Sequence, residues 1–384
     1  MRTIGVVTVA RSDYGLLRPV LRAIEQHPQL ELHLLVGGMH LAAEFGRTIS
    51  MIEDDGFTVG ASVAAPVDTD DPAGIARAMG RGTIGFGEAL GERRPDVLLV
   101  LGDRYETHAA VTAALPFALP VAHVHGGEST EGLIDEAIRH SITKMSHLHF
   151  AATEEYGRRI VQMGESPWRV TVSGAPGLDE IRVLEPLGGD ELEREYGLRV
   201  TPETLLVTYH PVTLEIEETE ARVRALLDAL EASGRDVVFT APNADTSRDL
   251  VARAIDELVA RSDRAVLVRD LGTRAYLTLL GRVAAMVGNS SSGIIEAASF
   301  RLPVVNVGSR QQGRVRAANV IDTGDSRDEI LDGIRRAVAP EFRAGLHGLE
   351  NPYGDGHAAA RIVSVLAEVP LDRRLIVKSF HDLG

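Results

Sequence analysis

Short apolar runs rich in β-branched residues alternate with longer amphipathic stretches along the chain. In the first half, such runs read as buried parallel strands at residues 4–10, 32–38, 96–103, 120–125, 148–153 and 170–174. Apolar residues recur with helical spacing between them, for example over 13–27 and 133–148. Strand–helix alternation of this kind predicts βαβ units and parallel sheets covered on both faces.

A second series of strand-like runs follows a polar, glycine-containing stretch at 183–203, which we interpret as a linker. The series comprises residues 204–211, 236–243, 265–270, 284–293 and 302–309. A chain of 384 residues exceeds the usual size of one core, so one large open sheet is the weaker interpretation. We therefore predict an α/β protein with two doubly wound, Rossmann-like domains, 1–185 and 186–365. A site in the cleft between them, beyond the carboxyl ends of the strands, is expected.

Composition narrows the chemistry. The chain has no cysteine, which excludes disulfides, thiolate metal ligands and a cysteine nucleophile. A formal net charge of −15 argues against general nucleic-acid binding, although a few local arginines can still hold a small anion. No signal peptide and no apolar run long enough to span a bilayer are recognised, so no membrane association and a cytoplasmic location are expected.

Polar side chains follow several of the predicted strands. Asp103 and Arg104 come after one strand, His125 and Glu128 after the next, and His210 after a third. A single strand-end aspartate is often only a helix N-cap. Several polar strand ends in one chain favour a site instead.

The segment 123–140, HVHGGESTEGLIDEAIRH, concentrates proton-handling groups around two glycines. On its predicted helix, Asp135 and Arg139 are four residues apart, as are Glu136 and His140, so each pair shares a face. Exposed ion pairs explain Glu136 well, but Asp135 lies in the first helical turn, where it can reach a cleft. His123 and His125 lie two residues apart on a strand, yet no metal-ligand spacing follows, and we expect no metal.

The segment 288–300, GNSSSGIIEAASF, is the best anion site in the sequence. A strand runs into Ser290, Ser291, Ser292 and Gly293 and then a helix, where backbone N–H groups suit a diphosphate. Glu296, one turn on, can accept hydrogen bonds from a ribose diol. Candidate phosphate contacts are Arg11, Arg310 and Arg314. The lysine of a P-loop and the GxGxxG of a nicotinamide site are both missing, so no cofactor is expected.

Several motifs in order carry a family resemblance. They are RSDYGLL, GDRYE, HVHGGESTEGLIDEAIRHSITKMSHLHF, GAPGLD, YHPVT, GNSSSGIIEA and NPYGDG. Together they resemble the hydrolysing UDP-N-acetylglucosamine 2-epimerases of bacterial sialic acid biosynthesis, over about residues 3–367. The resemblance implies a GT-B arrangement, with segment 366–384 crossing back to the first domain. It also implies anti elimination of UDP to a 2-acetamidoglucal, followed by addition of water to give N-acetylmannosamine, without metal or NAD.

The resemblance also suggests roles for residues. Asp103 and Asp135 look like carboxylates that handle sugar protons, and His210 would lie near the leaving diphosphate. The other matched positions are Arg139 and His140 at the helix start, Ser291, Ser292 and Gly293 in the diphosphate loop, Glu296 at the ribose, Arg11 and Arg314 at phosphates, and Asn243 at nucleotide or sugar.

One departure from the family pattern leaves a role open. Many members have a glutamate where this chain has His125, so either His125 or Glu128 could transfer the proton. The HGGE sequence also resembles members that act on UDP- or GDP-linked diacetamidobacillosamine. A non-hydrolysing epimerase, a GT-B glycosyltransferase and a catalytically silent sensor would each use the same nucleotide-sugar cleft, and the sequence leaves all three open. By resemblance, a UDP-sugar substrate, UDP product and a homodimer or homotetramer are expected.

Overall fold

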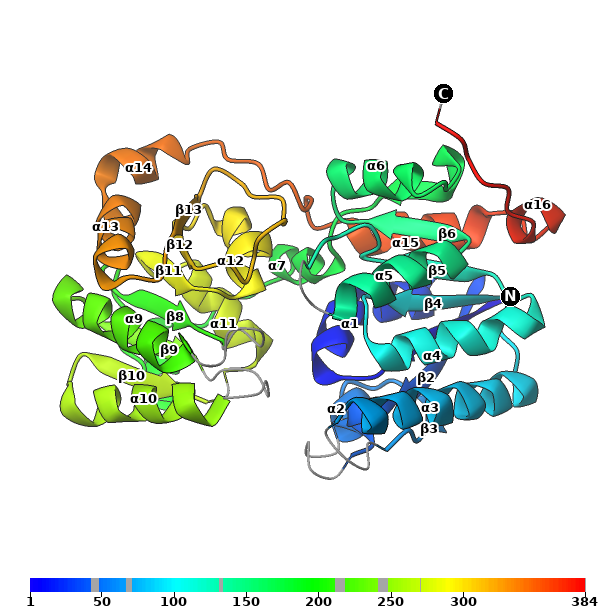
Figure 1. The fold of residues 1–384 in the computed structure, drawn as a ribbon, viewed down its shortest axis with the longest axis horizontal. Coiled ribbons are helices and arrows are strands. Elements are labelled where there is room, and N and C mark those ends of the chain that lie inside the picture. The colour runs from blue at the N-terminus through cyan, green and yellow to red at the C-terminus, as the bar shows by residue number, and fades with distance from the viewer. Residues whose placement is uncertain are drawn as a thin grey trace. The chain divides into compact units, whose positions relative to one another are not determined.

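The computed structural model describes residues 1–42, 48–66, 71–130, 134–210, 218–240, 248–269 and 271–383. Within them the chain forms two compact units (Figure 1). The first comprises residues 1–180 and 353–384, and the second comprises residues 181–352. Each is a parallel α/β unit, so the predicted fold class of two Rossmann-like domains is confirmed. The predicted GT-B arrangement concerns the placement of the units and stays a prediction.

The first unit holds a seven-stranded parallel sheet in the order β3-β2-β1-β4-β5-β6-β7. Its strands are β1 (Arg2–Thr8), β2 (Leu30–Gly37), β3 (Val59–Val63), β4 (Val97–Leu101), β5 (Val121–Val124), β6 (Leu148–Ala151) and β7 (Val170–Val172). Its helices are α1 (Arg11–Gln26), α2 (Ile49–Asp54), α3 (Pro72–Glu92), α4 (Tyr105–Ala114), α5 (Ile134–Met145), α6 (Glu154–Gln162), α15 (Ala358–Glu368) and α16 (Arg373–Ile376), with α7 (Asp179–Arg182) at the change of unit.

The continuous apolar runs divide their side chains between the two faces of this sheet. In β1, Ile4 and Val6 pack with α1, α2 and α15, whereas Val7 and the following Val9 pack with α3, α4 and α5. Successive strand residues point to opposite faces, so a strand covered on both sides must be apolar throughout. This requirement produces the runs that identify the strands in the sequence.

The second unit repeats this plan with a six-stranded sheet in the order β10-β9-β8-β11-β12-β13. Its strands are β8 (Leu205–Thr208), β9 (Val237–Thr240), β10 (Ala265–Val268), β11 (Ala285–Gly288), β12 (Val304–Val307) and β13 (Val320–Thr323). Helices α9 (Thr219–Ser233), α10 (Arg248–Arg261) and α13 (Arg327–Val338) cover one face. Helices α8 (Gly189–Tyr196) and α11 (Gly272–Leu280) contribute to the other core, and α12 (Ser291–Ile295) and α14 (Pro340–Gly345) complete the unit.

Three details differ from the sequence expectations. The edge strands β3 and β13 were missed, because neither forms a continuous apolar run. Stretch 183–203, which the sequence suggested as the linker, belongs to the second unit: it contains α8, and Leu187, Leu192 and Leu198 pack into the core of that unit. The changes of unit fall at 180/181 and 352/353, where the sequence suggested 185/186 and 365/366.

The C-terminal residues belong to the first unit, to which packing, hydrogen bonds and an ion pair attach them (Figure 1). Ile362 and Leu366 of α15 enter its core. The Arg169 guanidinium donates hydrogen bonds to the carbonyl groups of Arg374, Leu375 and Val377. Lys378 forms a 2.7 Å ion pair with Glu165. Burial opposes ionisation of Glu165, but hydrogen bonds from His149, Lys144 and Lys378 outweigh it and lower its pKa to about 2.

Candidate active site

Both sheets reverse their strand order between two central strands, β1 and β4 in the first unit and β8 and β11 in the second. Ligands of doubly wound sheets bind beyond the carboxyl ends of the strands at such a point. The candidate residues predicted from the sequence follow these strand ends or those of the neighbouring strand: Arg11, Asp103, Arg104, His125, His210 and Ser290.

His125 and Glu128 form a buried pair just beyond β5. His125 Nδ1 lies 2.5 Å from Glu128 Oε1, and the two residues are only 7% and 4% exposed. His125 has a φ of +65°, which is uncommon for a residue with a Cβ and is typical of functional sites. Its Nε2 is buried and has no hydrogen-bond partner among the described residues.

Two glycines, Gly126 and Gly127, permit the turn that joins His125 to Glu128. Gly127 has a φ of +76°, and a Cβ there would come within 2.4 Å of the Tyr156 carbonyl oxygen. A larger residue at 127 would therefore displace either α6 or the loop. The HGG sequence thus permits a tight turn at residues 125–127, directly after β5.

Arg139 joins Asp103 to the start of α5. Its buried guanidinium forms a salt bridge with Asp103 and a 3.1 Å ion pair with Glu136, and it donates to the Glu128 carbonyl oxygen. Glu136 also accepts hydrogen bonds from the Thr130 N–H and from the Ser129 hydroxyl. The expected Glu136–His140 pair is present at 3.1 Å. Glu136 is half-buried rather than exposed, and besides the predicted pair it bonds to Ser129, Thr130 and Arg139.

A second cluster lies at the ends of β1 and β4. The buried Asp13 carboxylate accepts hydrogen bonds from the N–H groups of Val9 and Ala10, which holds the two residues that lead into Arg11 at the start of α1. Arg104 Nη1 lies 3.6 Å from Met39 Sδ. Burial raises the pKa of both Asp13 and Glu106, while the Arg104 charge lowers both. Arg104 is thus the cation of a buried carboxylate cluster.

His123 has a structural role. It is fully buried, with Nδ1 3.2 Å from Thr143 Oγ1 and Nε2 2.8 Å from the Gly102 carbonyl oxygen. Burial lowers its pKa to about 3, so it is neutral. Within the described residues, no group of three or more histidines or carboxylates is arranged to hold a metal ion.

The depressed pKa of His123 predicts a pH-dependent stability of the first unit. The unfolded side chain takes up a proton near its ordinary pKa of 6.5, but the folded one does so only near 3. Its contribution is therefore complete above pH 6.5 and is lost as the pH falls below it. Between the two pKa values, about 3 and 6.5, His123→Gln should reduce the pH slope of the unfolding free energy by about 1.4 kcal/mol per pH unit. Denaturant titrations followed by fluorescence of Trp168, the single tryptophan, report this unit; parallel slopes would refute the expectation.

In the second unit, one buried asparagine links the polar strand ends. Asn289 follows β11, and its side chain accepts a 2.7 Å hydrogen bond from the His210 N–H and donates a 2.8 Å one to the His210 carbonyl oxygen. The Asn289 carbonyl oxygen accepts hydrogen bonds from Arg310 and Gln311. Burial, with a contribution from the Arg310 charge, lowers the pKa of His210 to about 3. His210 is therefore a neutral hydrogen-bonding group.

The serine-rich loop leads into a short helix. Ser290 is the N-cap of α12, with its hydroxyl accepting from the Ser292 N–H. Because α12 spans five residues, its macrodipole is small, whereas Arg310 brings a positive charge to this strand end through its bond to the Asn289 carbonyl oxygen. Burial raises the pKa of Tyr276, to which the nearby Glu296 charge adds. Glu296 thus lies near a neutral phenol, that of Tyr276.

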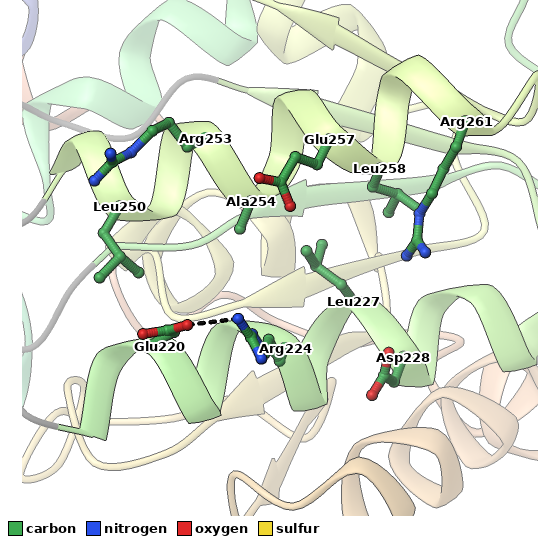
Figure 2. A pocket seen from close by; sticks show the side chains of 10 residues that line it. All are labelled: Glu220, Arg224, Leu227, Asp228, Leu250, Arg253, Ala254, Glu257, Leu258 and Arg261. Atoms are coloured by element: carbon green, nitrogen blue, oxygen red, sulfur yellow. Dashed lines mark hydrogen bonds and ion pairs between the residues drawn. The ribbon is translucent and has the colours of Figure 1, made fainter.

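A hollow also lies between α9 and α10 (Figure 2). Leu227, Leu250 and Leu258 are among its lining residues, together with six charged residues that include the Glu220–Arg224 ion pair. It is formed by helices on one face of the sheet, not by the polar strand ends. None of the residues predicted for the site lines it.

Comparison with known proteins identifies the family. The family model described as UDP-N-acetylglucosamine 2-epimerase matches residues 22–367. The chain belongs to this family. A Legionella pneumophila relative, UDP-N,N'-diacetylbacillosamine 2-epimerase (hydrolyzing), is 38% identical over 98% of this chain and 99% of its own. A Campylobacter jejuni relative, GDP/UDP-N,N'-diacetylbacillosamine 2-epimerase (hydrolyzing), is 34% identical over 100% of this chain and 99% of its own.

Solved structures share the fold of this epimerase-family chain. Staphylococcus aureus MnaA, determined with UDP, superposes with a TM-score of 0.80 at 19% identity, covering 100% of both chains.

In the part of our chain that the structure describes, no helix has both the length and the apolar character needed to cross a bilayer.

The structure brings part of the predicted site together. In this family member, Asp103, Arg139, His125 and Glu128 form one connected group, whereas Arg104 belongs to the neighbouring cluster with Asp13. Asp135 is half-buried in the first turn of α5. Asn243 lies outside the described residues. Asn289 lies in the segment 288–300 that the sequence indicates as an anion site but is not among the predicted site residues; its position directly after a strand, as for His210, is the signal that could have found it.

Proposed function

We propose that this chain is a hydrolysing 2-epimerase of a UDP-linked 2-acetamido sugar. In the proposed reaction, the C2 proton passes to a base while the C1–O bond to UDP breaks, giving the 2-acetamidoglucal. Water then adds its hydroxyl at C1 and a proton at the opposite face of C2, giving the free manno-configured sugar. The observation that carries the proposal is the buried His125–Glu128 pair, in which His125 Nε2 has no hydrogen-bond partner among the described residues.

The first unit supplies the proton-transfer groups. An ionised Glu128 only accepts hydrogen bonds, so His125 carries its hydrogen on Nδ1 and presents the Nε2 lone pair as a base. A carboxylate that accepts from Nδ1–H fixes the tautomer and orientation of a histidine base in this way. Asp103 and Asp135 are the carboxylates proposed to handle the remaining sugar protons. Asp103 is the better supported because Arg139 holds it in place.

The second unit supplies nucleotide-binding groups. Charge develops on the diphosphate as the C1–O bond breaks, and fixed positive charge stabilises it. We assign this role to Arg310 and Arg314, with Ser290 to Gly293 holding phosphate oxygens. Neutral His210 donates a hydrogen bond to the leaving group rather than a positive charge. Arg11 and Arg104 are proposed as further polar contacts of the substrate from the first unit.

The relatives favour UDP-N,N'-diacetylbacillosamine as the sugar nucleotide. Two relatives that align over almost all of this chain are named for diacetylbacillosamine, one linked to UDP and the other to GDP or UDP. The family description supports UDP-N-acetylglucosamine, with N-acetylmannosamine as product, as the second candidate. Both substrates contain the same reacting atoms at C1 and C2.

The decisive experiment is proton NMR with each sugar nucleotide in D₂O. Free UDP together with a manno-configured sugar deuterated at C2 is the expected result. A deuterated sugar that retains UDP would indicate the non-hydrolysing reaction, and turnover that requires an added acceptor would indicate a glycosyltransferase. Comparing kcat/KM for the two nucleotides assigns the preferred sugar. The cytoplasmic location and the homodimer or homotetramer stay predictions.

Glu296→Ala should weaken UDP binding about 10- to 100-fold, the usual effect of losing a hydrogen bond to a charged group. Calorimetric titration with UDP measures it. The proposed contact is with the ribose, so the loss should shrink when 2'-deoxy-UDP replaces UDP. An equal loss for both ligands would place Glu296 away from the 2'-hydroxyl.

A further inference from the structure

We infer that Asn289 is a positioning residue that sets His210 and Arg310 for the departing diphosphate. The inference rests on the proposed function and extends it to a residue outside the predicted site. Asn289 is 1% exposed, so its side chain acts through its neighbours rather than on the substrate.

The backbone pairing of β8 with β11 ends at Asn289, which explains why a polar side chain is needed there. Strands β8 and β11 pair from Leu205 with Ala285 to Thr208 with Gly288. The next ladder bond, from Asn289 N–H to the Thr208 carbonyl oxygen, is 3.1 Å long. Gly288 has a φ of +133°, and a Cβ there would lie 2.0 Å from the Thr208 oxygen. The chain therefore turns sharply against β8 at this glycine.

The Asn289 amide extends the pairing past the turn. Its oxygen accepts from the His210 N–H at 2.7 Å, and its NH₂ donates to the His210 carbonyl oxygen at 2.8 Å. A side-chain amide thus replaces a strand as the partner of His210. Aspartate has the same shape but, when ionised, loses the donor and faces a carbonyl oxygen.

Asn289 also fixes the loop that follows β12. Its main-chain oxygen accepts a 2.8 Å bond from Gln311 and a 3.3 Å bond from Arg310. The ends of β8, β11 and β12 therefore meet at one residue. Loss of the side chain should let His210 shift against Arg310, and a misplacement of about 1 Å can cost about 100-fold in rate.

The test compares Asn289→Ala and Asn289→Asp with a matched control, Asn319→Ala. Asn319 is also fully buried and donates to a backbone carbonyl, that of Leu302, but it lies just before β13, at the opposite edge of the sheet. Thermal unfolding, UDP affinity by calorimetry, and kcat and KM are measured for all four proteins. We expect Asn289→Ala to weaken UDP binding about tenfold and lower kcat about 100-fold, with Asn319→Ala within twofold of the parent despite reduced stability.

Asn289→Asp provides a rescue that a purely structural role would not give. Burial raises the pKa of a carboxyl group, and a protonated carboxyl can both donate and accept as the amide does. UDP affinity of this variant should therefore recover as the pH is lowered from 8 to 5.5, relative to the parent at each pH.

The outcomes separate the two claims. Parent-like UDP affinity and kcat in Asn289→Ala, or equal losses in Asn319→Ala, overturn the positioning role. If the parent binds UDP without consuming either sugar nucleotide, the proposed function fails, while the UDP affinities still decide the role of Asn289. A parent that binds no UDP overturns both.

Discussion

Asp103→Asn should lower kcat by about 10²- to 10⁴-fold, the usual contribution of one acid–base group. Asparagine keeps the shape of the side chain but cannot take up or release the proton. The fold should survive, because Arg139 keeps its ion pair with Glu136 and its bond to the Glu128 carbonyl oxygen. The measurement is kcat and kcat/KM from UDP release. Asp135→Asn, measured alongside, tests the other carboxylate.

Asp96→Asn is the matched control for this expectation. Asp96 precedes β4 and Asp103 follows it, so the same substitution is made at opposite ends of one strand. The Asp96 carboxylate accepts a 2.8 Å hydrogen bond from the Thr3 N–H, and its loss should affect stability alone. Near-parent kcat in Asp103→Asn, or an equal fall in Asp96→Asn, would remove the acid–base role from Asp103.

The sequence predicts the interior strands well because burial on both faces leaves them apolar throughout. Edge strands β3 and β13 carry no such requirement: β3 is exposed at alternate positions, and β13 contains Asp322. Their pairing is set by neighbours rather than by their own pattern. The fold class therefore follows from local sequence, but the extent of each sheet does not.

The site is predictable in position but not in detail. Polar residues after strands gather at the carboxyl edge of each sheet, where parallel strands end together and a site is expected. The Arg139–Asp103 and Asn289–His210 contacts join residues 36 and 79 positions apart, so no local pattern specifies them. The positive φ of His125 likewise depends on the loop around it. Helical spacing predicts that Asp135 and Arg139 share one face of a helix, whereas the salt bridge of Arg139 with Asp103 forms only in the folded sheet.

The second large effect is expected at the His125–Glu128 pair. His125→Gln should lower kcat about 10²- to 10⁴-fold, because glutamine can still bond to Glu128 but cannot accept a proton. It should lower the incorporation of solvent deuterium at C2 in parallel, since both depend on the same proton transfer. His147→Gln is the control. His147 is also buried and accepts a 3.1 Å hydrogen bond from the Val121 N–H, but it lies before β6, at the opposite end of the strands.

Glu128→Gln tests how the histidine is held. A carboxamide can donate to Nδ1, which would move the imidazole hydrogen to Nε2 and remove the base. The loss should therefore approach that of His125→Gln, as expected when a carboxylate fixes the tautomer of a catalytic histidine. If Glu128→Gln is severe while His125→Gln is mild, Glu128 itself transfers the proton.

The double variant distinguishes a unit from two independent groups. If Glu128 acts only through His125, the double variant should be no slower than His125→Gln alone, because the second substitution has nothing left to disturb. Independent roles would instead multiply the two losses. Since Nδ1 of His125 lies 2.5 Å from Glu128 Oε1, and Nε2 has no partner in the described part of the chain, we expect the first result. Multiplied losses would assign two separate proton transfers to these residues.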